Sequence, residues 1–131
     1  MELNIIIILI TLMYFISGLQ KSTNLDNVVK GLKSRLGINM PYYIYQMIIL
    51  LVIILEILGP LFIVKGSFDK NYKEIGIYSA YGLVIFTILA TLIYHFPPFG
   101  NTYYPFISNI TSIGALLLIA YVLKNDKRIL K

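Results

Sequence analysis

The sequence predicts an all-α fold: a four-helix transmembrane bundle, with room for a short interfacial helix in its first loop. The composition is 58% hydrophobic and 13% charged, and the mean hydropathy of +0.80 is typical of integral membrane proteins. Four apolar runs approach or reach the roughly 20 residues that cross a hydrocarbon core about 30 Å thick. With 131 residues in total, the whole chain (1–131) is expected to form a single transmembrane domain.

The four helices are predicted at about 3–19, 41–64, 75–94 and 104–123. The first run begins with Glu2 instead of a basic segment and lacks a small-x-small cleavage site, which favours a retained helix over a secretory signal. Pro41 suits the first turn of the second helix. The third run ends at His-Phe-Pro-Pro, which cannot continue a helix, and Pro105 opens the fourth.

The first loop carries apolar residues at helical spacing with lysines between them. This pattern predicts a short amphipathic helix that lies in the membrane interface with its lysines among the headgroups. The alternative is an ordinary solvated loop. The apolar residues are Leu25, Val28, Val29, Leu32 and Leu36.

The distribution of basic residues predicts that both termini are cytoplasmic. With four crossings, the side that holds the termini carries seven basic residues against four on the other, and basic loops favour the cytoplasm. Because these residues flank apolar spans, the net charge of +5 indicates contact with lipid headgroups, not with nucleic acid. The seven are Lys65, Lys70, Lys73, Lys124, Lys127, Arg128 and Lys131, and the four are Lys21, Lys30, Lys33 and Arg35.

The chain has no cysteine and one histidine, His95. The lack of cysteine excludes disulfides, thiol catalysis and iron–sulfur ligation by this chain. A single histidine cannot build a multi-histidine centre, so we expect no metal or heme site formed by the chain alone.

Glu56 is the only acidic residue inside the four apolar runs, and it stands four positions before Pro60. A proline cannot donate the helical hydrogen bond to the carbonyl four residues earlier, and ionisable groups within the membrane usually face a bundle interior or a wet cavity. At 1.5 Å per residue, Glu56 lies about 22 Å from the outer end of its helix. If the first helix is straight, that depth places Lys21 too far away for an ion pair, whereas Lys65 is closer. Hydrogen-bond partners at a similar depth are Tyr78, Ser79, Tyr81 and Tyr121.

Two interpretations of Glu56 stay open. The first is a structural residue that joins two helices and only satisfies its own hydrogen bonds. The second is a functional group that transfers protons or contacts a ligand.

A second set of polar residues is expected toward the outer face. If these residues point inward, they form a pocket with a cation, an imidazole and several amides, suited to an anionic or quinone-like headgroup. The alternative is that they are polar because water is near. The candidate ligand-binding residues are Lys21, Gln46, His95 and Asn109, together with Glu56, and their polar neighbours are Ser17, Gln20, Thr111 and Ser112.

Small residues and one proline mark expected sites of close helix packing or bending. Small side chains let the backbones of membrane helices approach each other. The expected packing positions are Gly18, Gly59, Gly82 and Gly114, and Pro60 is the expected kink.

The chain resembles the DoxX-like family of four-helix membrane proteins over nearly its whole length. The resemblance rests on Phe-Ile-Ser-Gly-Leu-Gln-Lys at 15–21, on Glu56 followed by Gly59 and Gly66, on His95, and on Asn-Ile-Thr-Ser-Ile-Gly at 109–114. Pro60 stands where the family often has a second glycine, and the usual arginine near the start of the first helix is missing. Position by position, the resemblance implies that the pattern of the family corresponds to Gly18, Lys21, Glu56, Gly59, His95 and Asn109 of this chain.

The resemblance implies a function, because the family includes subunits of membrane oxidoreductase complexes, thiosulfate:quinone oxidoreductase among them, and receptor-assembly chaperones. We therefore expect a small subunit of a membrane complex without independent catalytic activity, with a quinone or lipid as ligand. A partner or a diffusible quinone would carry any electrons. The alternative is a non-enzymatic membrane scaffold or assembly factor, including a viral or organellar structural protein. The expected partners are the lipid bilayer and other membrane proteins or further copies of the chain.

Overall fold

Every regular element in the computed structural model, which describes residues 2–95 and 98–125, is a helix. Four helices are long and apolar enough to cross a membrane, which confirms the predicted fold class and the four predicted spans to within a few residues. The elements are α1 (Glu2–Thr23), α2 (Leu25–Leu36), α3 (Tyr42–Phe68), η1 (Lys70–Tyr72), α4 (Lys73–Tyr94), η2 (Gly100–Thr102) and α5 (Tyr103–Asn125).

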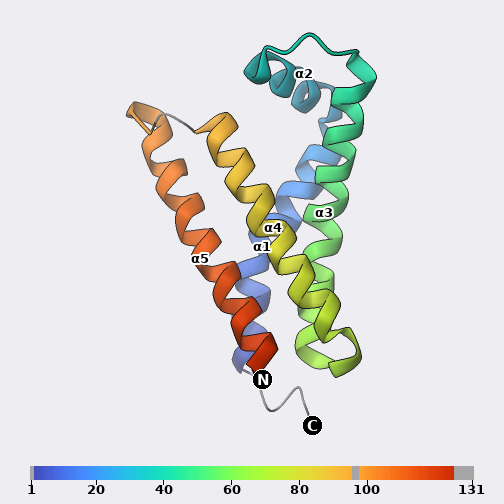
Figure 1. Cartoon of the computed structure of the whole chain (residues 1–131), viewed down its shortest axis with the longest axis vertical. Helices are drawn as coiled ribbons and strands as arrows, with labels where there is room; N and C mark the ends of the chain where they lie inside the picture. Colours follow the sequence, from blue (N-terminus) through green and yellow to red (C-terminus); the bar gives the residue numbers. More distant parts are fainter. Residues whose placement is uncertain (1, 96–97, 126–131) are drawn as a thin grey trace.

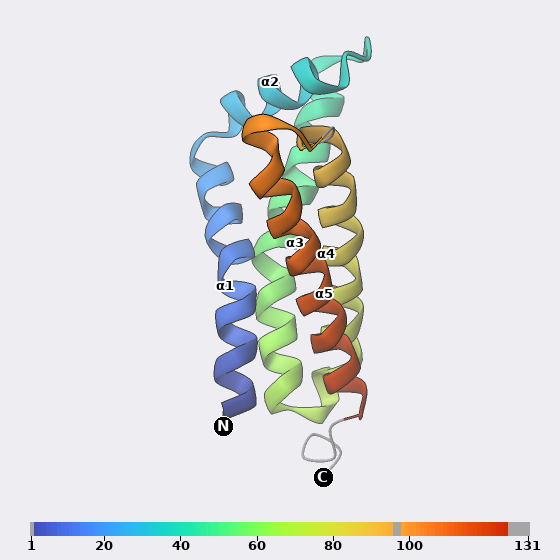
Figure 2. The same ribbon diagram turned by 90° about the vertical axis from the view of Figure 1, so that its left-hand side faces the viewer.

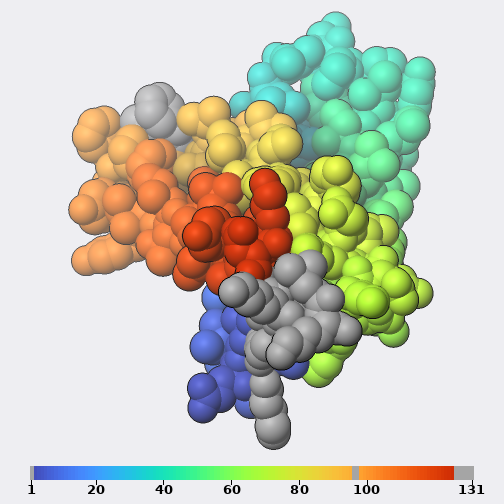
Figure 3. All heavy atoms as spheres, turned by 60° about the horizontal axis from the view of Figure 1, so that its bottom comes forward, coloured from blue at the N-terminus to red at the C-terminus, as the bar shows by residue number. Residues whose placement is uncertain are grey.

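The long helices pack in the order α1, α3, α4, α5, so that α3 and α4 each have a long helix on both sides. The start of α1 and the end of α5 lie at one end of the bundle, here called the terminal end, and α2 lies across the other, the α2 end (Figures 1 and 2). With the terminal end tilted toward the viewer, the last turns of α5 (red) lie beside α4 (yellow-green), and the first half of α1 (blue) projects below them (Figure 3). Toward the α2 end, α5 leans away from α1 (Figure 1).

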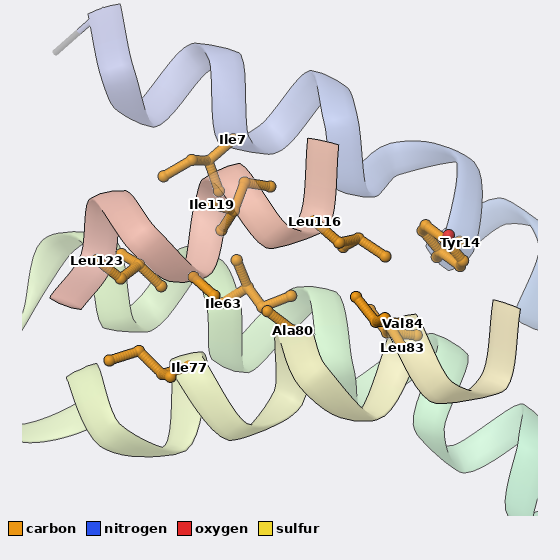
Figure 4. Packing of buried hydrophobic residues seen from close by; sticks show 11 residues of the cluster. Ile7, Tyr14, Ile63, Ile77, Ala80, Leu83, Val84, Leu116, Ile119 and Leu123 are labelled. Carbon is orange, nitrogen blue, oxygen red and sulfur yellow. The ribbon is translucent and has the colours of Figure 1, made fainter. Parts of the chain in front are cut away.

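The main core lies in the half of the bundle nearer the terminal end. Ile7 of α1 meets Ile119 of α5 there, and Leu83 and Ile63 join α4 and α3 to the same cluster (Figure 4). This is where α1 and α5 are held together.

Most side chains in the apolar stretches of the four long helices are not buried by the protein itself. Leu9, Leu51, Ile85 and Leu118 are each more than half exposed. So large an apolar surface would favour aggregation in water, whereas acyl chains solvate it without cost.

The first loop forms α2, as its apolar spacing predicts, and is not an unstructured solvated loop. Val29 and Leu32 on its apolar face are buried against Tyr45 and Ile49 of α3, so these two residues face protein instead of lipid. Arg35, in the last turn, donates to the Tyr94 carbonyl at 3.2 Å and lies over the Tyr94 ring. A cation suits the exposed carbonyls at the end of α4.

The docking of α2 shows that α3 extends past the end of α1. Residues 45–53 of α3 pack against α2, whereas Gly18, near the end of α1, faces Glu56 in the middle of α3. The last turn of α1 is therefore level with the middle of α3 and not with its first turn.

Candidate functional site

The polar centre of the bundle is an ion pair between α1 and α3. The Lys21 ammonium donates to both carboxylate oxygens of Glu56, at 2.8 and 3.0 Å, and to the Ser17 hydroxyl at 2.5 Å. Phe86 of α4 stands beside it, with the ammonium 6.0 Å from the ring centroid. We call Ser17, Lys21 and Glu56 the ion-pair cluster.

The expectation that Lys21 is too far from Glu56 is wrong. It assumed that the outer ends of the two helices are level, but α3 begins well beyond the end of α1. The lysine side chain shortens the distance further, because helical side chains point back toward the N-terminus. The contact with Ser17, one turn earlier, shows that Lys21 takes this direction.

The other partners proposed for Glu56 are also not its partners. Lys65 turns to Tyr72 instead, with its ammonium 5.1 Å from the ring centroid. The aromatic residues Tyr78, Tyr81 and Tyr121 are exposed, and Ser79 is half-buried. Both oxygens of Glu56 are instead occupied by Lys21.

Gly18 allows the close approach of α1 and α3 that the ion pair needs. A Cβ at this position would lie 2.8 Å from Ile57 Cγ1 and 3.0 Å from Glu56 Cβ. Gly59 faces α4, where a Cβ would lie 3.2 Å from Leu83, and at Gly82 it would lie 3.4 Å from Leu55. Small residues thus lie at the α1–α3 and α3–α4 contacts.

Gly114 does not fit the expected packing role, because it is exposed on α5 and a Cβ there would have no atom within 4 Å. Pro60 is buried within α3, and the helix runs through it from Tyr42 to Phe68. Since proline has no N–H, it donates nothing to the Glu56 carbonyl.

A second group of polar side chains connects α1, α4 and α5. The Thr87 and Thr91 hydroxyls donate to carbonyls of α4 four residues earlier, at 2.7 and 2.6 Å. Thr87 therefore accepts from the Tyr14 hydroxyl at 2.7 Å, and Thr91 accepts from the Asn109 amide at 3.0 Å. We call Tyr14, Thr87, Thr91 and Asn109 the hydroxyl ladder.

The remaining candidates of the predicted outer pocket do not all converge. Gln46 lies ten residues from Glu56 along α3, which is about 15 Å. His95 follows α4. Its backbone N–H donates to the Thr91 carbonyl, and its ring is tilted against the Tyr94 ring. Gln20 and Thr111 are exposed, whereas Ser112 lies near the Tyr14 hydroxyl.

Sequence reasoning missed Tyr14, Thr87 and Thr91, which are all at least 95% buried. A signal for them was available. Tyr14, Ser17 and Lys21 follow the spacing of one helix face, as do Thr87 and Thr91. Polar residues that repeat on one face of an apolar helix indicate the side that faces protein.

The geometry gives Lys21 a distinct chemical capacity. Two of its N–H groups serve the same carboxylate, so one can move to a carbonyl oxygen while the other keeps the ion pair. The Lys21 side chain is 25% exposed and that of Glu56 1%. A molecule from outside can therefore reach the cation, but not the anion.

Replacing Thr87 by Val tests the hydroxyl ladder. The change leaves the Tyr14 hydroxyl buried without its acceptor, and we expect a loss of about 0.6 kcal/mol of unfolding free energy, at most about 1.7 kcal/mol, as for other hydrogen bonds between membrane helices. The matched control is Thr111→Val, because that hydroxyl is exposed and bonds only the Ile107 carbonyl of its own helix. Equal losses, measured by unfolding in mixed detergent, would show that the Tyr14 bond contributes nothing.

Comparison with known proteins gives one family. The DoxX family model matches residues 5–96, which include the ion-pair cluster, Tyr14, both threonines of the hydroxyl ladder and His95, but not α5 with Asn109. No curated protein and no solved structure matches the chain. The match covers more than half of the sequence and agrees with the four apolar helices. The chain is therefore an integral membrane protein that belongs to the DoxX family.

Proposed function

We propose that the protein is a small subunit of a membrane complex and binds the headgroup of a quinone-like ligand at the ion-pair cluster. The observation that carries the proposal is the difference in exposure within the pair: Glu56 is enclosed and holds the cation in place, while Lys21 stays accessible. A fixed ammonium among apolar side chains is a strong donor to a ligand carbonyl, because charge-assisted hydrogen bonds gain strength where the local dielectric is low.

The surroundings of Lys21 suit a flat ring that carries carbonyl groups. Phe86 provides an aromatic surface beside the ammonium, and the Tyr14 hydroxyl lies one to two turns along the same face of α1. Apolar walls with a few fixed polar groups are typical of small-molecule sites. This chain has no cysteine, so its part in redox work is to hold the ligand while a partner supplies the electron transfer.

We further propose that both termini are cytoplasmic. Lys21 is neutralised by Glu56 inside the bundle and no longer belongs to the loop charge. Among the described residues, the three remaining basic residues at the α2 end are Lys30, Lys33 and Arg35, against Lys65, Lys70, Lys73 and Lys124 at the other, and the further residues of the prediction, Lys127, Arg128 and Lys131, lie outside the described residues. The asymmetry that favours cytoplasmic termini thus becomes larger.

A scaffold role is the second candidate, and one observation favours it. Both carboxylate oxygens of Glu56 are bonded and the residue is 1% exposed. A fully satisfied pair of this kind needs no ligand to join α1 to α3.

The double variant Lys21→Met/Glu56→Leu separates the two functions. Replacing both charges by apolar groups leaves no unpaired charge, so the bundle is expected to stay folded. If the ligand function is right, quinone that co-purifies with the wild-type protein in mild detergent, measured by chromatography of the extract, is lost from this variant. The control Lys30→Met, an exposed change on α2, should keep it.

The opposite result has a clear meaning. If neither wild type nor variant carries quinone, and the double variant supports full cellular function, the ligand proposal is wrong and the scaffold function stands.

A further inference from the structure

A groove lies between α1 and α3 at the terminal end of the bundle, away from the ion-pair cluster. Ile8, Leu12 and Phe15 of α1 form one wall, and Leu61, Val64 and Phe68 of α3 form the other. Thr11 and Pro60, both buried, also line it, and the groove has a volume of about 370 Å³.

The lining of the groove is apolar for a structural reason. The only uncharged polar side chain in it is that of Thr11, and its hydroxyl donates to the Ile7 carbonyl of its own helix at 2.9 Å. That bond satisfies the Thr11 hydroxyl within its own helix. Apolar side chains therefore meet an occupant along the whole length of the groove.

One charged residue, Lys65, lines the groove. Its side chain is exposed, and its ammonium rests over the Tyr72 ring, 5.1 Å from the centroid. An aromatic ring at the end of a membrane helix marks the headgroup level. Lys65 thus presents a cation at headgroup level above an apolar channel.

The length of the groove matches one leaflet. From Pro60 to Phe68 is about 12 Å along α3, while half of a bilayer's hydrocarbon core is about 15 Å. An acyl chain that runs from the level of Phe68 to Pro60 would span most of this depth.

We propose that the α1–α3 groove binds an anionic phospholipid of the leaflet at the terminal end, with one acyl chain in the groove and the phosphate beside Lys65. The charge of this end favours an anionic lipid, because its described residues include four lysines, Lys65, Lys70, Lys73 and Lys124, against three acidic residues, Glu2, Asp69 and Glu74. Basic sites between membrane helices are known to select anionic headgroups.

A second copy of the chain fits the groove less well. A symmetric contact through the groove would bring the Lys65 side chains of both copies toward one interface. Like charges at an apolar contact oppose association, whereas a phosphate neutralises the same cation.

The test is photo-crosslinking in phosphatidylcholine vesicles that contain a phosphatidylglycerol probe with a diazirine at the end of one acyl chain. Mass spectrometry should place the adducts mainly in residues 8–15 and 60–64. We expect Lys65→Gln to lower this labelling about fivefold, the effect of one lysine beside an anionic headgroup. Labelling by a phosphatidylcholine probe should not change.

Two controls complete the design. Lys124→Gln removes a cation of the same end on α5 and should leave the labelling unchanged, whereas Leu12→Trp narrows the groove and should reduce labelling by both probes. Adducts spread evenly over the lipid-facing helices, or a phosphatidylglycerol signal indifferent to Lys65→Gln, would overturn the proposal. Crosslinks between two copies through the groove would show that a second chain occupies it.

Discussion

Replacing Lys21 by Met is expected to destabilise the bundle by about 3–5 kcal/mol, the cost of leaving one member of a buried ion pair without its partner. The loss is large because Glu56 is 1% exposed and its two oxygens have no other bonded partner among the described residues. Unfolding in mixed detergent measures the loss.

The partner variant gives a smaller expected loss. Glu56→Gln keeps one oxygen that can accept from Lys21, and Lys21 is 25% exposed and can reach solvent or headgroups. The order of losses, Lys21→Met above Glu56→Gln, therefore follows from the difference in burial. A reversed order, or a Lys21→Met loss no larger than that of Lys30→Met, would contradict the enclosed position of Glu56.

Replacing Gly18 by Leu is expected to separate α1 from α3 at the level of the ion pair. A Cβ alone would lie 2.8 Å from Ile57 and 3.0 Å from Glu56, and overpacking of this kind costs about 1–3 kcal/mol, occasionally more. The lost ion-pair geometry adds to this cost. Gly18→Ala should have the same sign and a smaller size, measured by the same unfolding assay.

Gly114 provides the matched control for that experiment. It lies in a long helix as Gly18 does, but no atom is within 4 Å of a Cβ placed there. Gly114→Ala should therefore cost nothing. If Gly18→Leu is as harmless as Gly114→Ala, the two helices are not in the close contact described above.

The four membrane helices could be predicted from the sequence because the residue patterns that define them are local. Twenty or so apolar residues with proline, glycine and charged residues at their ends define a membrane span without reference to the rest of the fold. The predicted second helix, about 41–64, ends four residues before the observed end at Phe68. The prediction stopped before Lys65 because that residue is charged, but a lysine can continue a membrane helix into the headgroup region.

The ion-pair partner of Glu56 could not be predicted from local sequence patterns. It depends on how far α3 extends beyond α1, and that offset is set by α2 packing its Val29 and Leu32 against the first turns of α3. No local pattern in either membrane helix encodes the offset. Lys21 was thus selected correctly as a polar candidate, yet its pairing followed only from the arrangement of three helices.

The hydroxyl ladder shows a different limit. Threonine in a membrane helix commonly bonds its own backbone, so its presence alone predicts no contact between helices. The bonds from Tyr14 to Thr87 and from Asn109 to Thr91 follow from which faces meet. Asn109 was a candidate from the sequence, whereas the spacing of Tyr14 with Ser17 and Lys21 predicts a shared helix face but not the bond to Thr87.

The most direct test is a distance measurement between Lys21 and Glu56 in a lipid bilayer. Solid-state NMR of the protein with ¹⁵N in the lysine ammonium groups and ¹³C in the glutamate carboxyl groups reports this distance, and the other glutamates, Glu2 and Glu74, are exposed near the terminal end. We expect a strong Nζ–Cδ coupling, as for groups in an ion pair closer than about 4 Å, which disappears in Lys21→Met and persists in Lys65→Gln. A spectrum without that coupling, or one in which Lys65→Gln abolishes it, would show that Glu56 is not held by Lys21.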